Sequence, residues 1–253
     1  MRLKSLHRWV RRIWVTGGLL FMSALVWNIQ AHGVPAEAYV SDVRVRVETT
    51  EYGRAFRPVS AVTGRAFVFI PGGLIDPRAY VPLARAVADA GIPTALVNIP
   101  WRAAPTERMR ATLWSRIQSA KEHVGGGRPI VLGGHSRGGM LSSEFAADRP
   151  GDLAGLVLIG TTHPRDRDLS RGTWPVLKIL GTRDCVASVR DARANQSRLP
   201  AHAQWLEIEG ANHRQFGYYG WQMADCDASM SREEQHRRVV GAVVALVTGI
   251  PAP

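Results

Sequence analysis

The sequence predicts an α/β fold in which a mostly parallel sheet is covered by helices on both faces. Short continuous apolar segments alternate with segments of helical periodicity from about residue 65 onward. Continuous apolar strands are typical of parallel strands that are buried on both faces. A chain of 253 residues with 45% hydrophobic content is long enough to form one domain of this kind.

The elements are expected in an order that supports this fold class. Residues 43–49 alternate apolar and charged side chains, as expected of a half-solvated edge strand. The other expected strands are 65–73, 94–100, 129–134, 153–160, 175–181 and 203–210. The expected helices are 76–91, about 105–124, about 137–148, about 186–197 and 231–247. Ser231 and Glu234 have the spacing of a capping box ahead of the last helix.

The N-terminus predicts an export or anchoring segment. Five basic residues without an acid precede the uncharged segment 13–29, which carries Trp14 and Trp27 near its ends. Three interpretations remain open: an uncleaved membrane anchor, a cleaved signal that leaves a secreted or periplasmic protein, and a buried helix. In the first two, the domain lies outside the cytoplasmic membrane. We divide the chain into residues 1–35, the basic and anchoring or signal segment, and 36–253, the folded domain.

The charge distribution disfavours nucleic-acid binding. The net charge is +11, but five positive charges lie in the first twelve residues, and the others are scattered among acids. A dense basic stretch with interleaved aromatic residues would be expected of a nucleic-acid surface.

A nucleophile motif lies between an expected strand and an expected helix. Gly134-His135-Ser136-Arg137-Gly138 has the pattern Gly-x-Ser-x-Gly, and its small residues allow a serine to project from a tight turn. A phosphate-binding loop is disfavoured, because no Gly-Lys-Ser/Thr follows.

A serine hydroxyl needs a base and a group that orients the base. Asp184 follows the strand 175–181 and His213 follows the strand 203–210, which gives the chain order Ser136, Asp184, His213. Asp166 and Asp191 are weaker alternatives for the acid, because neither directly follows a strand.

These motifs resemble the α/β-hydrolases, in particular small dienelactone-hydrolase-like members, some of which carry an N-terminal anchor. The similar segments are "FIPGGLIDPRAYVPLARAVADAG", "GGHSRGG", "GTRD" and "GANHRQFGYYGWQ". The resemblance covers about residues 36–248 and implies the three-layer α/β-hydrolase fold, with Ser136 as nucleophile, His213 as base and Asp184 as acid. The short connection between residues 160 and 175 indicates little or no lid domain.

The oxyanion hole is expected to use the backbone N–H of Arg137 and one from the turn after residue 70. Gly73 is the first choice there and Leu74 the second. Five side chains are candidates for the substrate pocket: Trp101, His163, Trp174, Phe216 and Tyr218. No histidine spacing of a metal site occurs, and neither a metal nor a cofactor is expected.

The favoured function is therefore a serine hydrolase that cleaves a carboxylic ester or related acyl compound through an acyl-enzyme. The expected partners are a small-molecule or lipid-like acyl substrate and a membrane, the latter through residues 13–29. An acyltransferase and a catalytically silent binding protein of the cell envelope are the alternatives.

The two cysteines, Cys185 and Cys226, follow the expected acid and the expected base along the chain. In an oxidising compartment they are expected to form a disulfide that connects the two loops. Two free buried thiols and a nucleophilic cysteine are the alternatives.

Overall fold

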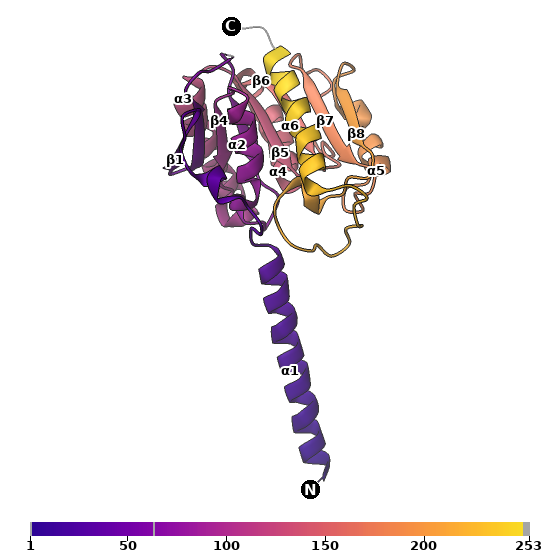
Figure 1. The fold of residues 1–253 in the computed structure, drawn as a ribbon. Coiled ribbons are helices and arrows are strands. Elements are labelled where there is room, and N and C mark those ends of the chain that lie inside the picture. The colour runs from indigo at the N-terminus through magenta and orange to yellow at the C-terminus, as the bar shows by residue number, and fades with distance from the viewer. Residues whose placement is uncertain (1, 63, 250–253) are drawn as a thin grey trace.

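The computed structural model describes residues 2–62 and 64–249 and shows one eight-stranded sheet with a long helix projecting from one end of the domain (Figure 1). The strand order is β1-β2-β4-β3-β5-β6-β7-β8; β2 is antiparallel to both of its neighbours, and the other neighbouring pairs are parallel. The strands are β1 (Val45–Thr50), β2 (Gly53–Pro58), β3 (Phe67–Ile70), β4 (Thr94–Val97), β5 (Ile130–His135), β6 (Leu153–Ile159), β7 (Val176–Gly181) and β8 (Gln204–Ile208).

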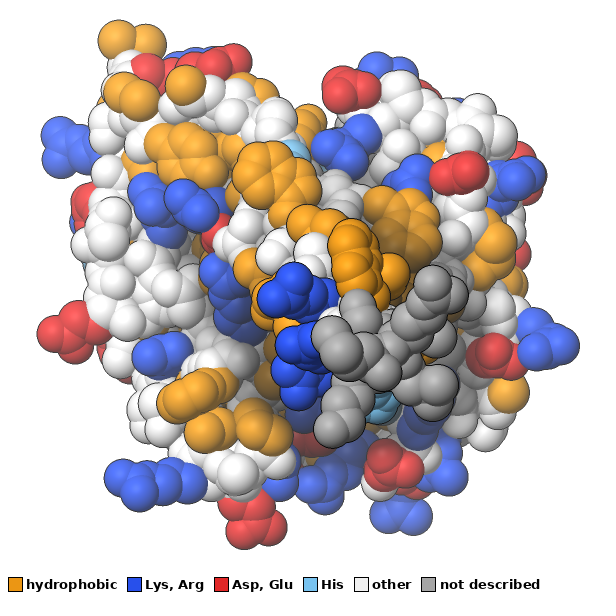
Figure 2. Space-filling view, turned by 90° about the horizontal axis from the view of Figure 1, so that it is seen from below, with side chains coloured by type: hydrophobic (Ala, Val, Ile, Leu, Met, Phe, Trp, Pro, Cys, Tyr) orange, Lys and Arg blue, Asp and Glu red, His pale blue; other side chains and the backbone are white. Residues whose placement is uncertain are grey.

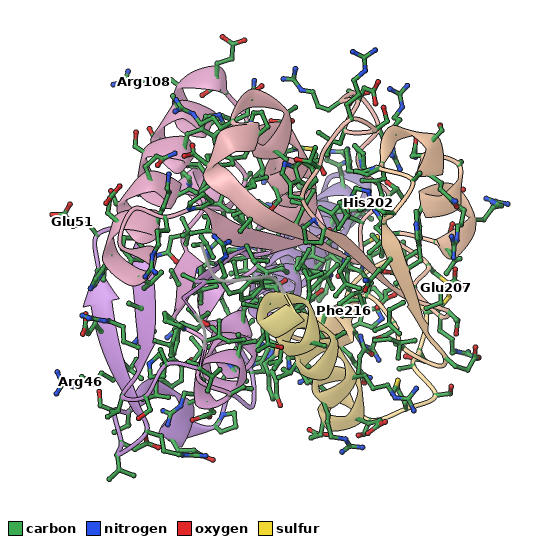
Figure 3. The ribbon with its side chains drawn as sticks, turned by 90° about the horizontal axis from the view of Figure 1, so that it is seen from above. Arg46, Glu51, Arg108, His202, Glu207 and Phe216 are labelled. Atoms are coloured by element: carbon green, nitrogen blue, oxygen red, sulfur yellow. A yellow bond between two sulfur atoms is a disulfide. The ribbon has the colours of Figure 1, made fainter. Side chains whose placement is uncertain are left out.

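Helices cover both faces of the sheet, as the view along its edge in Figure 3 shows. Helices α2 and α6 pack on one face, and α3 and α4 pack on the other. The helices are α1 (Arg2–Asn28), α2 (Val81–Asp89), α3 (Glu107–Gly125), α4 (Arg137–Asp148), α5 (Val189–Arg193) and α6 (Arg232–Gly249).

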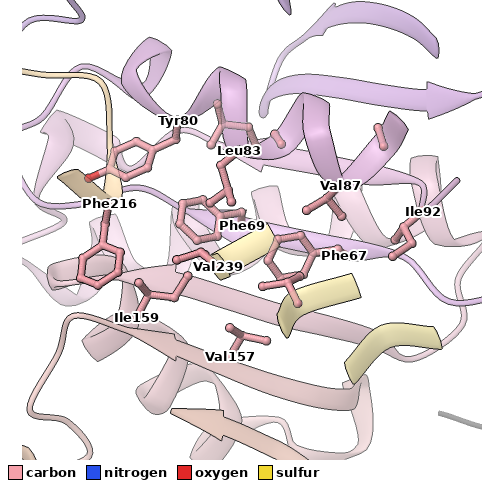
Figure 4. Packing of buried hydrophobic residues seen from close by; sticks show 14 of the residues in the cluster. Phe67, Phe69, Tyr80, Leu83, Val87, Ile92, Val157, Ile159, Phe216 and Val239 are labelled. Atoms are coloured by element: carbon pink, nitrogen blue, oxygen red, sulfur yellow. The ribbon is translucent and has the colours of Figure 1, made fainter. Parts of the chain in front are cut away.

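Strand side chains alternate between two hydrophobic cores. Phe67 and Phe69 of β3 point to the face under α2 and α6, where Val157, Ile159 and the helix residues close around them (Figure 4). Val68 and Ile70 of the same strand point to the opposite core under α3 and α4. Both faces of the central strands are therefore buried, which explains their continuous apolar sequence.

The structure confirms the three-layer α/β fold and corrects some of its elements. Strand β2 was not predicted, because "GRAFRP" contains two arginines and a proline and lacks an apolar alternation. The expected helix 76–91 begins with a 3₁₀ turn, Pro77–Tyr80, before α2. The expected helix 186–197 is reduced to α5. Ser231 Oγ accepts the N–H of Glu234, which is one of the two hydrogen bonds of the expected capping box. The last four residues of the expected domain lie outside the described residues.

Helix α1 lies outside the domain and joins it where the parallel strands end. Residues His7–Asn28 are long and apolar enough to cross a membrane, and none of that segment is buried against the domain. The Asp76 N–H, beyond β3, donates to Ile29 O at 2.8 Å, and the Gly220 N–H, beyond β8, donates to Asn28 O at 2.9 Å. The chain after α1 is thus held by two loops from the carboxyl ends of strands.

Candidate active site

Ser136 occupies a strained turn between β5 and α4. Its backbone has φ 53° and ψ −115°, which is unfavourable for a residue with a side chain. A Cβ on Gly138 would lie 2.1 Å from Ile70 O, and a Cβ on Gly134 would lie 2.3 Å from the Gly138 carbonyl group. The two glycines of the motif are required because strand and helix approach too closely for larger residues.

Asp184 and His213 form a buried pair at the ends of neighbouring strands. Asp184 Oδ2 lies 2.8 Å from His213 Nδ1, and the two residues are 4% and 1% exposed. The other carboxylate oxygen accepts the N–H groups of Val186 at 2.9 Å and Ala187 at 2.6 Å. This arrangement holds Asp184 as an acceptor and favours the tautomer with the proton on Nδ1, which leaves Nε2 of His213 free to accept a proton.

His135 and His213 lie side by side and connect the buried Asp184–His213 pair to the turn that carries Ser136. The ring of His135, which directly precedes Ser136, lies 4.5 Å from the ring of His213. The Ser136 hydroxyl makes no hydrogen bond with any described residue. Catalytic hydrogen bonds are often long in free enzymes and tighten on substrate binding.

The turn after β3, which carries the expected oxyanion donor Gly73, packs directly against the start of α4. A Cβ on Gly73 would lie 2.9 Å from Arg137 Cβ, so a larger residue would displace this turn from the nucleophile. Arg137 is the first residue of α4, where a backbone N–H has no partner within the helix. The Leu74 N–H donates to Arg102 O at 2.7 Å, and this bond corrects our second choice of donor. Gly73 and Arg137 remain the candidate donors.

Tyr80 and His135 form a buried support beneath the site that the sequence did not reveal. The Tyr80 hydroxyl lies 2.8 Å from His135 Nδ1, and both side chains are buried. Burial, followed by His213 and His236, lowers the pKa of His135 well below its usual value. His135 therefore stays neutral near neutral pH and adds no second charge beside His213. No pattern in the sequence marks Tyr80 as a partner of His135.

Asp225 holds the backbone of the base. Its carboxylate accepts the N–H groups of His213 at 3.2 Å, Arg214 at 2.9 Å and Cys226 at 3.0 Å. The predicted disulfide is present, with 5.4 Å between the Cα atoms of Cys185 and Cys226. It joins the neighbour of Asp184 to the neighbour of Asp225, and so connects the loops of the acid and the base.

Removing the disulfide is expected to destabilise the protein and to lower activity. The bond closes a loop with a sequence separation of 41, so the chain-entropy model gives about 4 kcal/mol. Thermal unfolding of the double variant Cys185→Ser/Cys226→Ser measures this effect. Because the bond joins the two loops, hydrogen exchange of the amides at 184–187 and 225–226 should rise before that of β5. Equal exchange in both regions would contradict this order.

The five candidate pocket residues do not lie together. Trp174 is buried at the amino end of β7, where its carbonyl accepts from His202. Ser136 lies at the carboxyl ends of the strands, so the assignment of Trp174 to the pocket is corrected. Phe216 lies in the hydrophobic core, and its ring centroid is 5.4 Å from that of His135. Tyr218 packs against His236 of α6, at 5.0 Å between ring centroids.

The remaining two candidates lie in loops at the carboxyl ends of strands. Trp101 follows β4 and is 82% exposed, and its backbone has φ 54°. His163 follows β6; burial, followed by the charge of Arg165, lowers its pKa to about 4, and Arg137 is among its charged neighbours. The loop of Trp101 is held beside the nucleophile, because Arg137 Nε donates to Ala103 O at 3.0 Å.

Neither alternative acid forms a hydrogen bond with His213, whose partners are Asp184 and Asp225. Asp191 lies on α5, where its N–H donates to Ser188 Oγ and its carboxylate accepts from Arg190 Nε. Asp166 is exposed in the connection between β6 and β7. Within residues 2–62 and 64–249, no three His, Cys, Asp or Glu side chains come together as a metal site.

Comparison with known proteins identifies the family and the fold. The model of the alpha/beta hydrolase family matches residues 66–237. No curated protein matches the sequence. Carboxylesterase CesB from Bacillus subtilis is similar in structure, with a TM-score of 0.56, 16% identity and coverage of 84% of this chain and 94% of that chain.

Two further solved structures have a similar fold. Dienelactone hydrolase from Anabaena variabilis has a TM-score of 0.59 and 16% identity, covering 82% of this chain and 99% of its own. A monoacylglycerol lipase from Paleococcus ferrophilus has a TM-score of 0.56 and 16% identity, covering 79% of this chain and 98% of its own.

Proposed function

This chain belongs to the alpha/beta hydrolase family, and on that premise we propose that it is a serine hydrolase that cleaves carboxylic esters. The observation that carries the proposal is the buried Asp184–His213 pair, 2.8 Å apart, beside the strained turn of Ser136. A catalytically silent protein has no need to keep a buried carboxylate, an oriented imidazole and a strained serine together.

In the proposed reaction, Ser136 Oγ attacks the ester carbonyl while His213 Nε2 takes the hydroxyl proton. Asp184 stabilises the imidazolium that forms, and the N–H groups of Gly73 and Arg137 donate to the developing oxyanion. His213 then gives its proton to the leaving alcohol, and an acyl-enzyme remains on Ser136. Water activated by His213 releases the carboxylic acid and restores the serine.

We also propose that residues 1–35 form a retained anchor for the catalytic domain 36–253, outside the cytoplasmic membrane. Ile29, Ala31 and Val34 pack against the core beneath α2 and α6. Ala31 also forms a β-bridge with Tyr219, and the His32 N–H donates to Tyr218 O at 2.8 Å. Cleavage after Ala31, the nearest approach to a signal-peptidase site, would cut through these contacts.

The activity is tested with p-nitrophenyl esters of increasing acyl length and the full chain in detergent. We expect saturable hydrolysis of at least one ester, with a burst of p-nitrophenol if deacylation is slower than acylation. Absence of turnover across the series would contradict the hydrolase proposal.

N-terminal sequencing of the protein from its native host tests the anchor.

A further inference from the structure

Loops at the carboxyl ends of the strands, the end of the sheet where Ser136 lies, expose several large apolar side chains. We call this surface the mouth face and define it by Leu74, Trp101, Val186, Trp221 and Met223. Each lies in a loop after the carboxyl end of a strand: β3, β4, β7 and, for the last two, β8. Outside α1, the exposed tryptophans of the described chain are Trp101, at 82%, and Trp221, at 52%. Tryptophan is enriched where a protein meets the headgroup level of a bilayer.

The apolar helix ends on this same face, without a linker. Asn28, the last residue of α1, accepts the Trp221 N–H through its side chain at 2.5 Å and the Gly220 N–H through its carbonyl at 2.9 Å. The next residue, Ile29, accepts the Asp76 N–H from the loop that also carries Leu74. Figure 2 looks along α1 toward the end of the domain that the helix joins, and apolar and basic side chains lie next to each other near the centre of the view.

The length of α1 fixes where the bilayer must lie. The uncharged segment 13–29 follows Arg11 and Arg12 and has 17 residues, so it is about 26 Å long at about 1.5 Å per residue. That length is slightly below a hydrocarbon core of about 30 Å, so none of the apolar segment is left over outside the bilayer. The membrane surface therefore reaches the domain at Asn28, where the mouth face begins.

The charges beside this junction suit lipid headgroups. The buried carboxylate of Asp76 is paired with two guanidinium groups, of Arg78 at 2.6 Å and Arg102 at 3.6 Å. This cluster carries one positive charge in excess, and both arginine side chains are at least a third exposed. A guanidinium binds phosphate oxygens well at a membrane surface.

We propose that the mouth face lies on the membrane surface and that the ester substrate reaches Ser136 from the bilayer. The substrate class is an amphiphilic ester, with its acyl chain among the lipids and its ester group at headgroup level. The orientation follows from α1 and the mouth face alone, whereas the substrate class rests on the proposed hydrolase function.

The orientation is tested by fluorescence of the full chain in phosphatidylcholine vesicles containing some phosphatidylglycerol. The only two cysteines form the disulfide, so one introduced cysteine can be labelled selectively with a thiol-reactive NBD dye. The variant Met223→Cys places the dye on the mouth face. The matched control Val59→Cys places the dye at an exposed residue at the other end of the sheet. Val59 follows β2, whose residue Phe56 pairs with Thr94 at the amino end of β4.

We expect the emission of the Met223→Cys label to rise roughly two-fold or more and to be quenched by doxyl-labelled lipid, since the dye leaves water. The Val59→Cys label is expected to stay unquenched. Equal quenching at both positions, or at neither, overturns the orientation. A rise that occurs without lipid and grows with protein concentration shows that a second copy covers the face, and this result also overturns it.

The substrate class is tested with two esters of one alcohol. The full chain in vesicles is given 4-methylumbelliferyl palmitate, which resides in the bilayer, or 4-methylumbelliferyl acetate in water. We expect Trp221→Ser/Met223→Ser to lower the palmitate rate by roughly ten-fold and to leave the acetate rate within about two-fold, because only bilayer docking is weakened. Val59→Ser/Val62→Ser is the matched control and should change neither rate.

The two proposals fail in different ways. If acetate hydrolysis persists in Ser136→Ala, the proposed function fails, whatever the dye reports. If acetate hydrolysis requires Ser136 but the mouth-face variant lowers both ester rates equally or lowers neither, delivery from the bilayer is overturned and the hydrolase proposal stands.

Discussion

Replacing Ser136 by alanine is expected to lower kcat for ester hydrolysis by about 10⁴- to 10⁶-fold. The substitution removes the only atom that forms the acyl-enzyme, whereas the oxyanion donors and the fold remain. Residual hydrolysis, if any, should show no burst, because no covalent intermediate accumulates. Steady-state and pre-steady-state kinetics with the best p-nitrophenyl ester measure the effect.

Ser143→Ala is the matched control for this substitution. Ser143 is a buried serine on α4, seven residues after Ser136, and its hydroxyl donates to Gly139 O at 2.9 Å. Its loss should leave kcat within about two-fold, since an alanine is well accommodated in a helix. Comparable losses in both variants would indicate a disturbed fold and would contradict a specific role of Ser136.

Replacing Asp184 by asparagine is expected to lower kcat by about 10³- to 10⁴-fold with little change in KM. The asparagine amide can donate to His213 Nδ1 and so favours the tautomer in which Nε2 carries the proton. That tautomer cannot accept the proton of Ser136. The shape of the site should persist, because the asparagine carbonyl still accepts the Val186 and Ala187 N–H groups.

Asp191→Asn serves as the comparison, because Asp191 is the alternative acid and lies away from the base on α5. Its activity should match that of the original protein. A large loss in Asp191→Asn together with an active Asp184→Asn would reverse the assignment of the acid.

The parallel part of the fold was predictable because its strands are continuous and apolar. Helix α4 begins and ends as predicted, since the serine turn marks its start. Strand β2 escaped prediction because pairing with β1 and β4, rather than an apolar pattern, makes it a strand. The sequence pattern therefore predicted the parallel strands and the edge strand β1, and it missed β2, which lies between β1 and β4.

At the site, chain order and strand ends predicted Asp184 and His213, and the structure brings them within hydrogen-bonding distance. The supports Tyr80 and Asp225 were not predictable, because their contacts depend on how loops fold over the strand ends. Trp174 was misplaced for a related reason: a tryptophan just before a strand lies at the amino end of the sheet, away from the nucleophile.

The most direct test of the central claim is covalent labelling of the full chain with a fluorophosphonate, followed by intact mass measurement and peptide mapping. The account predicts one adduct per chain, on the peptide that contains Ser136, with a labelling rate that falls strongly in Asp184→Asn. No adduct, or an adduct on another residue in protein that hydrolyses esters, would contradict it.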